Sequence, residues 1–176
     1  MKERIKIYSD EICIYVSIGV NNPLYGKVAL ILADALILSV LILAIVIWIP
    51  GLALVSLLFL FFLTKYTLWN IYGRENVIIN TKNVTYQHDY GFFKTDYTIL
   101  PINKGLSLKV APAKPTENKE LLIKMTSYND NDLPVEIYTM ALSVPEDDVI
   151  RLNMLMKQLF VDKMAEEYML PPIHLN

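Results

Sequence analysis

The sequence has few of the residues on which most enzyme and metal sites depend. It contains one cysteine, Cys13, and two histidines, His88 and His174. A single cysteine excludes an internal disulfide and a cysteine-based zinc site, and the two histidines lack the spacing of a metal-binding pair. The six glycines are scattered singly, and no Gly-x-Ser-x-Gly motif occurs. We therefore expect no catalytic residues, no cofactor and no bound metal ion.

Charge is also sparse and unevenly placed. The formal net charge is -2, which gives no reason to expect a nucleic-acid partner. Residues 82–124 are rich in lysine, whereas residues 130–176 are mainly acidic. The basic part either favours anionic headgroups at a nearby membrane or is an ordinary solvated surface.

Residues 35–63 contain no charged side chain at all. About 20 apolar residues in a helix cross the ~30 Å hydrocarbon core of a bilayer, so this block is expected to span a membrane. A signal peptide fits poorly, because a polar segment that already resembles folded structure precedes the block. Proline and glycine at Pro50-Gly51 favour a turn, which predicts two antiparallel helices at residues 28–49 and 52–72.

Lysine and arginine flank the open ends of this predicted hairpin and are absent from its turn. By the positive-inside rule, both termini are expected in the cytoplasm. A re-entrant or interfacial second segment is the alternative, because the apolar run that follows the turn is short.

One acid, Asp34, interrupts the first helix. Counted from the turn, Asp34 and Lys65 reach the same depth, ~21–24 Å away and near the cytoplasmic boundary. We therefore expect an Asp34–Lys65 ion pair that fixes the register of the hairpin. The rival interpretation is a proton or ion site, but the charge-free block 35–63 supplies only Ser39 and Ser56 as further polar groups.

The rest of the chain predicts an antiparallel sheet or barrel followed by one helix. Alternating apolar and polar residues favour strands at 4–8, 12–18, 75–80, 84–90, 94–100, 105–110, 120–127 and 134–142. Serine, proline and three acids then start a helix at about residue 143. Its apolar stripe is expected to pack against the sheet and comprises Val149, Leu152, Leu155, Met156, Leu159 and Phe160. Pro171-Pro172 is expected to end this helix.

Two stretches, LTKYTLWNIYGRENVIIN and VTYQHDYGFFKTDYTILPI, resemble the small bacterial membrane proteins that carry a pleckstrin-homology-like (PH-like) domain. The residues that carry the resemblance are Leu68, Trp69, Gly73, Arg74, Glu75, Tyr90, Gly91 and Phe92. The resemblance implies a partly open barrel capped by a C-terminal helix, and a binding or scaffolding role. The long acidic C-terminal helix and the Pro-Pro tail depart from the pattern. A phosphoinositide ligand is not carried over, because the loop that would bind it offers only Lys82.

These observations predict an α+β membrane protein in three parts. Residues 1–23 form an N-terminal β-hairpin that completes the soluble domain, residues 24–72 a transmembrane helical hairpin, and residues 73–176 a cytoplasmic PH-like domain with its C-terminal helix. The expected function is a non-enzymatic binding or scaffold protein of the bacterial inner membrane. Its expected partners are the lipid bilayer and either another protein or a second copy, with no small-molecule substrate. The alternative is a small accessory subunit of a larger membrane complex.

Overall fold

The computed structural model describes residues 4–112 and 120–167, and the side chains of residues 4–112 and 120–161. The expected Pro-Pro helix end and His174 lie outside this range. The chain folds into two compact units. Among the described residues, the first comprises residues 4–18, 75–87, 96–112 and 120–167, and the second residues 19–74 and 88–95. The chain therefore passes between the units four times.

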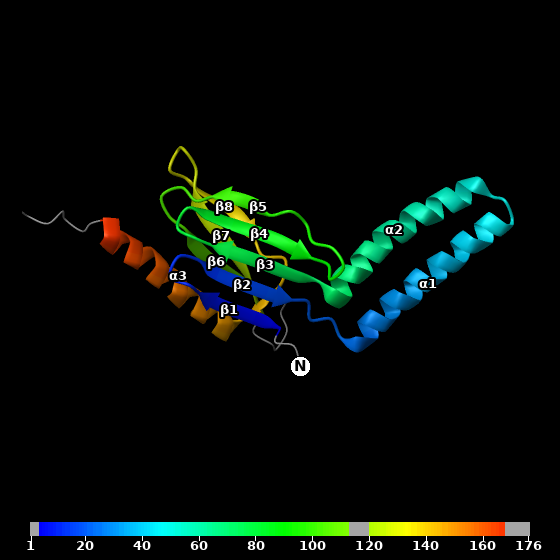
Figure 1. Ribbon diagram of the computed structural model, residues 1–176, viewed down its shortest axis with the longest axis horizontal. Coiled ribbons are helices and arrows are strands. Elements are labelled where there is room, and N and C mark those ends of the chain that lie inside the picture. Colours follow the sequence, from blue (N-terminus) through cyan, green and yellow to red (C-terminus); the bar gives the residue numbers. More distant parts are fainter. Residues whose placement is uncertain (1–3, 113–119, 168–176) are drawn as a thin grey trace, which may run out of the picture. The chain divides into compact units, whose positions relative to one another are not determined.

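The first sheet has five antiparallel strands in the order β1-β2-β3-β4-β5 (Figure 1). They are β1 (Ile5–Ser9), β2 (Ile14–Gly19), β3 (Arg74–Ile79), β4 (Asn83–Asp89) and β5 (Thr98–Pro101). The predicted N-terminal hairpin is present, and Ile7 pairs with Val16 in its register. Burial alternates along β2 and β3, as expected for strands with one face on a core.

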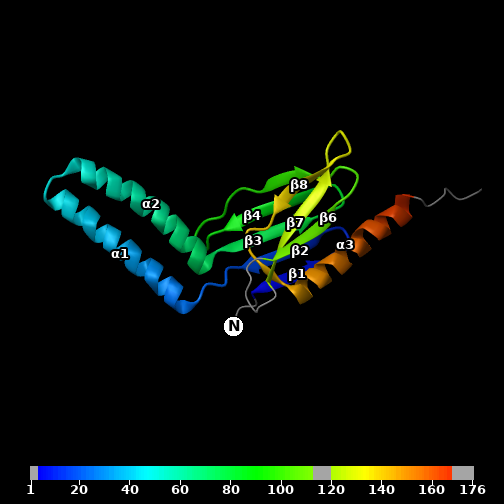
Figure 2. The same cartoon turned by 180° about the vertical axis from the view of Figure 1, so that it is seen from behind.

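The second sheet lies behind the first in Figure 1 and in front of it in Figure 2. It contains β6 (Ser107–Pro112), β7 (Glu120–Tyr128), β8 (Pro134–Thr139) and the short β9 (Val144–Pro145), which pairs with β7. The described strands thus form two antiparallel sheets rather than one closed barrel. Arg4 donates hydrogen bonds to Glu120 (2.6 Å) and to the Ser143 carbonyl (3.1 Å), and so links the start of β1 to the second sheet.

The core of the first unit lies between the two sheets and α3 (Glu146–Glu167). Helix α3 begins with the three acids Glu146, Asp147 and Asp148, whose charge suits the positive end of the helix dipole. The predicted apolar stripe packs as expected. Val149, Leu152, Met156 and Leu159 are buried, and Leu155 and Phe160 pack beside them.

The second unit is built around two antiparallel helices, α1 (Leu24–Val46) and α2 (Pro50–Tyr72), which lie side by side (Figure 1). Both are long and apolar enough to cross a membrane, and little of either is buried within the protein. The turn falls at residues 47–49, slightly earlier than predicted, and Trp48 there has a φ of 55°. Pro50 is the first residue of α2, where its missing N–H has no helical partner to lose.

Candidate functional site

An aromatic turn between β4 and β5 folds onto the end of α2 and belongs to the same compact unit. Residues 94–97 do not continue the strand predicted at 94–100; β5 starts only at Thr98. The Tyr90 N–H donates to the Phe93 carbonyl (2.9 Å), and the Gly91 N–H donates to Asp89 Oδ1 (2.8 Å). These bonds close a tight turn that presents three rings, from Tyr90, Phe92 and Phe93.

The rings of this turn stack on aromatic side chains of α2. The Trp69 ring lies 5.2 Å from those of both His88 and Tyr90, and Tyr72 meets Phe92 edge-on at 5.5 Å. Phe93 stacks in parallel on Tyr90 at 4.5 Å. Such pairs contribute ~0.5–1.5 kcal/mol each beyond burial, so several together hold the turn on the helix. We call these six rings the aromatic clasp.

Lys65 completes the arrangement. Its Nζ lies 5.6 Å from the centre of the Tyr90 ring, a cation–π contact worth ~0.5–1 kcal/mol at an exposed site. Beside it, a groove of about 330 Å³ runs along α2 and reaches Phe93. The clasp therefore places a cation and an apolar groove together.

Two glycines make this packing possible, and both belong to the eight residues that carry the resemblance noted in the sequence, which we call the motif residues. Gly91 has a φ of +88°, and a Cβ there would lie 2.7 Å from Tyr72 Cβ. Gly73 ends α2 by donating its N–H to the Trp69 carbonyl (2.8 Å), and a Cβ there would lie 2.1 Å from that oxygen. Leu68 lines the groove. Of the eight motif residues, Leu68, Trp69, Gly73, Tyr90, Gly91 and Phe92 thus meet at the clasp and groove, and Arg74 begins β3.

The remaining motif residue, Glu75, lies in the first unit and is fully buried. Its carboxylate accepts hydrogen bonds from the Tyr138 hydroxyl, the Ala141 N–H (3.1 Å) and the Leu142 N–H (3.0 Å). Burial, together with the neighbouring Glu75 carboxylate, raises the pKa of Tyr138. Glu75 therefore joins the first sheet to the second and is a structural group.

Polar side chains also lie inside the helical hairpin. Over residues 30–46 of α1 and 50–67 of α2, the less exposed residues form two facing stripes with the three-and-four spacing of packed helices. Those of α1 are Leu30, Ala33, Asp34, Ile37, Val40, Leu41 and Ala44, and those of α2 are Ala53, Ser56, Leu60, Leu63 and Thr67. Asp34 Oδ1 and Thr67 Oγ1 are both buried without a hydrogen-bond partner.

The structure does not bring Asp34 and Lys65 together as an ion pair: among the described residues, no salt bridge joins them. Lys65 is exposed and faces the clasp. The depth count ignored direction around the helix. Lys65 is two residues from Thr67, about 200° around α2 at 3.6 residues per turn, so it points away from the stripe that faces α1.

A second groove, of about 410 Å³, lies in the first unit beside β1 and α3. Its lining residues are Tyr8, Ser9, Glu11, Arg151, Leu155, Gln158 and Leu159. Arg151, Leu155 and Gln158 fall on one face of α3 by helical spacing, and Tyr8 is 56% exposed. The groove thus combines leucines with one cation, one anion and an amide, next to the terminal strand of a sheet.

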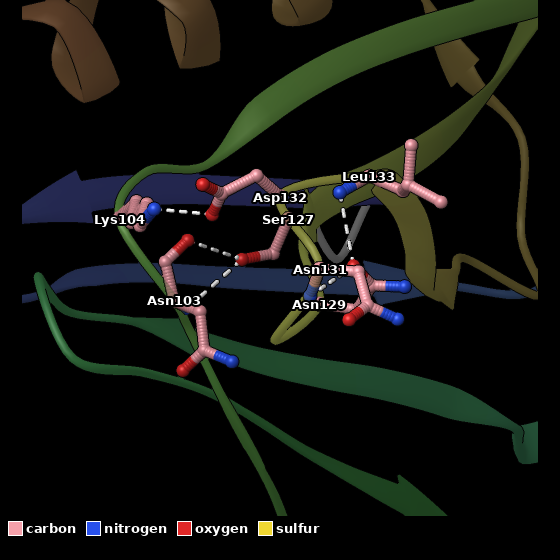
Figure 3. Close-up of polar contacts among 7 residues, drawn as sticks. All are labelled: Asn103, Lys104, Ser127, Asn129, Asn131, Asp132 and Leu133. Carbon is pink, nitrogen blue, oxygen red and sulfur yellow. Dashed lines mark hydrogen bonds and ion pairs between the residues drawn. The ribbon is translucent and has the colours of Figure 1, made fainter.

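A polar cluster joins the loop after β5 to the β7–β8 turn (Figure 3). The buried Ser127 hydroxyl donates to the Asn103 carbonyl (3.0 Å) and accepts from the Asn103 N–H (2.9 Å). Asn129 Oδ1 accepts from the N–H groups of Asn131 and Leu133. These bonds satisfy the turn internally, so we assign them a structural role. Within the described part of the chain, no three His, Cys, Asp or Glu side chains cluster as metal ligands would.

Sequence reasoning missed two buried polar groups for which the pattern held a signal. Glu75 shares the inward side of β3 with Val77 and Ile79, because successive side chains of a strand alternate between faces. Thr67 shares the inward stripe of α2 with Ser56 and Leu63. The resemblance singled out Trp69, Tyr90 and Phe92 of the aromatic clasp, but their contacts had no such signal because they join residues that are distant in sequence.

No protein-family model matches the chain, and no similar curated protein is found.

Proposed function

We propose that this protein is a membrane-anchored, non-enzymatic binding or scaffold protein that binds an extended segment of another protein. Helices α1 and α2 are the anchor, and the first unit is cytoplasmic. The observation that carries this proposal is the groove beside β1 and α3. Strand β1 is the terminal strand of its sheet, so its outer edge offers backbone groups to an added strand.

The composition of the groove favours a peptide over a small metabolite. Arg151 and Glu11 supply opposite charges, Gln158 supplies both a donor and an acceptor, and Leu155 supplies apolar surface. An extended peptide presents the same mixture of amides and alternating side chains.

Two antiparallel sheets with a C-terminal helix packed on β1 and β7 also support a PH-like relationship.

Site-specific photo-crosslinking in intact membranes tests this proposal. A photoreactive residue at position 158, on the groove face of α3, is expected to capture one discrete protein. The matched control is position 153, which is also exposed on α3 but does not line the groove. Capture of a second copy of this chain identifies a homo-oligomer, and equal capture from both positions contradicts a groove-specific partner.

The alternative, an accessory subunit of a larger membrane complex, is favoured by Asp34. Its buried oxygen has no partner within the described chain, and polar groups in a membrane usually find one on a neighbouring helix. Purification in mild detergent separates the two functions. Stoichiometric membrane proteins that remain bound to wild type and are lost from Asp34→Ala support the subunit role, while a lone monomer or homo-oligomer supports the scaffold role.

A further inference from the structure

The groove beside the aromatic clasp runs along one face of α2. Its lining residues are Leu57, Leu60, Phe61, Thr64, Lys65, Leu68 and Phe93. All are apolar except Thr64 and Lys65, which are adjacent. The groove therefore has apolar walls and one polar position where a cation lies.

The length of the groove fits one leaflet of a bilayer. Leu57 and Lys65 are ~12 Å apart along the helix axis at 1.5 Å per residue, which lies within the ~15 Å that is half of a ~30 Å hydrocarbon core. Leu57 and Phe61 are more than half exposed, at 55% and 65%. On a membrane helix such exposed apolar side chains contact lipid, so an acyl chain is the natural occupant of the groove.

Lys65 sets the chemistry of the other end. Within the described residues its ammonium group pairs with no carboxylate, and its one ring contact is with Tyr90. Tyr90 is held in turn between Trp69 and Phe93. The charge thus lies beside the clasp with no carboxylate partner among the described residues, and charge complementarity favours an anion at the level of the headgroups.

We propose that this groove binds one anionic phospholipid, with an acyl chain along α2 and its phosphate at Lys65. Thr64 adds a hydroxyl donor beside the phosphate. The proposal rests on the membrane placement of α1 and α2, and goes beyond the binding role proposed for the first unit.

The experiment is native mass spectrometry of the full chain in detergent with phosphatidylglycerol or phosphatidylcholine of identical acyl chains. Wild type is expected to retain phosphatidylglycerol about fivefold better than phosphatidylcholine, the factor equivalent to the ~1 kcal/mol that one basic side chain contributes near an anionic surface. Lys65→Gln is expected to abolish this preference, and Lys65→Arg to keep it. Lys27→Gln is the matched control, because it removes one charge from the same hairpin outside the groove.

Filling the groove tests the acyl-chain part separately. Leu57→Trp retains Lys65 and is expected to lower the binding of both lipids. Equal losses in Lys65→Gln and Lys27→Gln would overturn the proposal, as would unchanged lipid binding in Leu57→Trp. It would also fail if inorganic phosphate alone stabilised wild type against heat as much as phosphatidylglycerol does. Alkaline carbonate extraction of membranes that contain the protein shows separately whether helices α1 and α2 are embedded. Crosslinking from position 158 reports separately on the binding role proposed for the first unit.

Discussion

Replacement of Glu75 by glutamine changes one buried oxygen into an amide nitrogen and leaves the shape of the side chain almost intact. In wild type, the Glu75 carboxylate accepts hydrogen bonds from the Tyr138 hydroxyl and from two backbone N–H groups, at 3.1 Å and 3.0 Å. Glutamine has only one acceptor oxygen, so at least one of these donors loses its partner inside the core. Loss of a bond to a charged group costs ~1.5–3 kcal/mol, and an unsatisfied buried donor costs ~1–3 kcal/mol. We therefore expect Glu75→Gln to lower the free energy of unfolding by about 2–4 kcal/mol.

Thermal unfolding of the full chain in detergent, followed by intrinsic fluorescence, measures this loss. In a protein of this size 1 kcal/mol corresponds to ~2–4 °C, so a fall of about 5–15 °C is expected. Glu11→Gln is the control, because Glu11 is exposed and its replacement should cost less than ~0.5 kcal/mol. A melting temperature for Glu75→Gln equal to that of Glu11→Gln would refute a structural role for the buried carboxylate.

Three further predictions follow from local geometry. The hydrogen bond from Tyr15 to Asp10 raises the pKa of Tyr15 to about 12, so the stabilising effect of this bond is complete below pH 10 and is lost as the pH rises toward 12. An absorbance titration of wild type minus Tyr15→Phe should show this phenol ionising near pH 12. A difference curve centred at pH 10 would contradict the prediction. Gly91→Ala should lower the free energy of unfolding by ~1–3 kcal/mol, because Gly91 has a positive φ and lies against Tyr72. Gly105 has open space around it, so Gly105→Ala should have the melting temperature of wild type. Equal melting temperatures of the two variants would contradict the close fit at Gly91. Thr67→Val removes a buried hydroxyl that has no partner, so it should leave the melting temperature unchanged or raise it; a clear fall would mean that this hydroxyl is bonded in the membrane.

Local patterns predicted most elements of the fold. Alternation revealed the β1–β2 hairpin, and helical spacing revealed the buried stripe of α3. The turn of the helical hairpin was misplaced because Pro50-Gly51 was taken as the break. Proline is equally suited to the first turn of a helix, and composition alone cannot separate these two positions.

Features that depend on distant contacts could not be predicted in the same way. Residues 94–97 alternate like a strand, yet the aromatic turn before them stacks on α2 and the pairing of β5 starts at Thr98. The Asp34–Lys65 pair stays a hypothesis, based on equal depth but not on a shared face. The exchange of Asp34→Lys with Lys65→Asp remains its experiment: assembly no better than that of either single variant would count against the pair.

The membrane hairpin with a cytoplasmic binding unit is tested most directly by labelling single cysteines from each side of the membrane. In a Cys13→Ser background, one cysteine replaces Trp48 in the 47–49 turn and another replaces Asn153 on α3; both positions are exposed. A membrane-impermeant maleimide should label position 48 only in spheroplasts and position 153 only in inverted inner-membrane vesicles. Labelling of both positions from the same side would contradict a spanning hairpin.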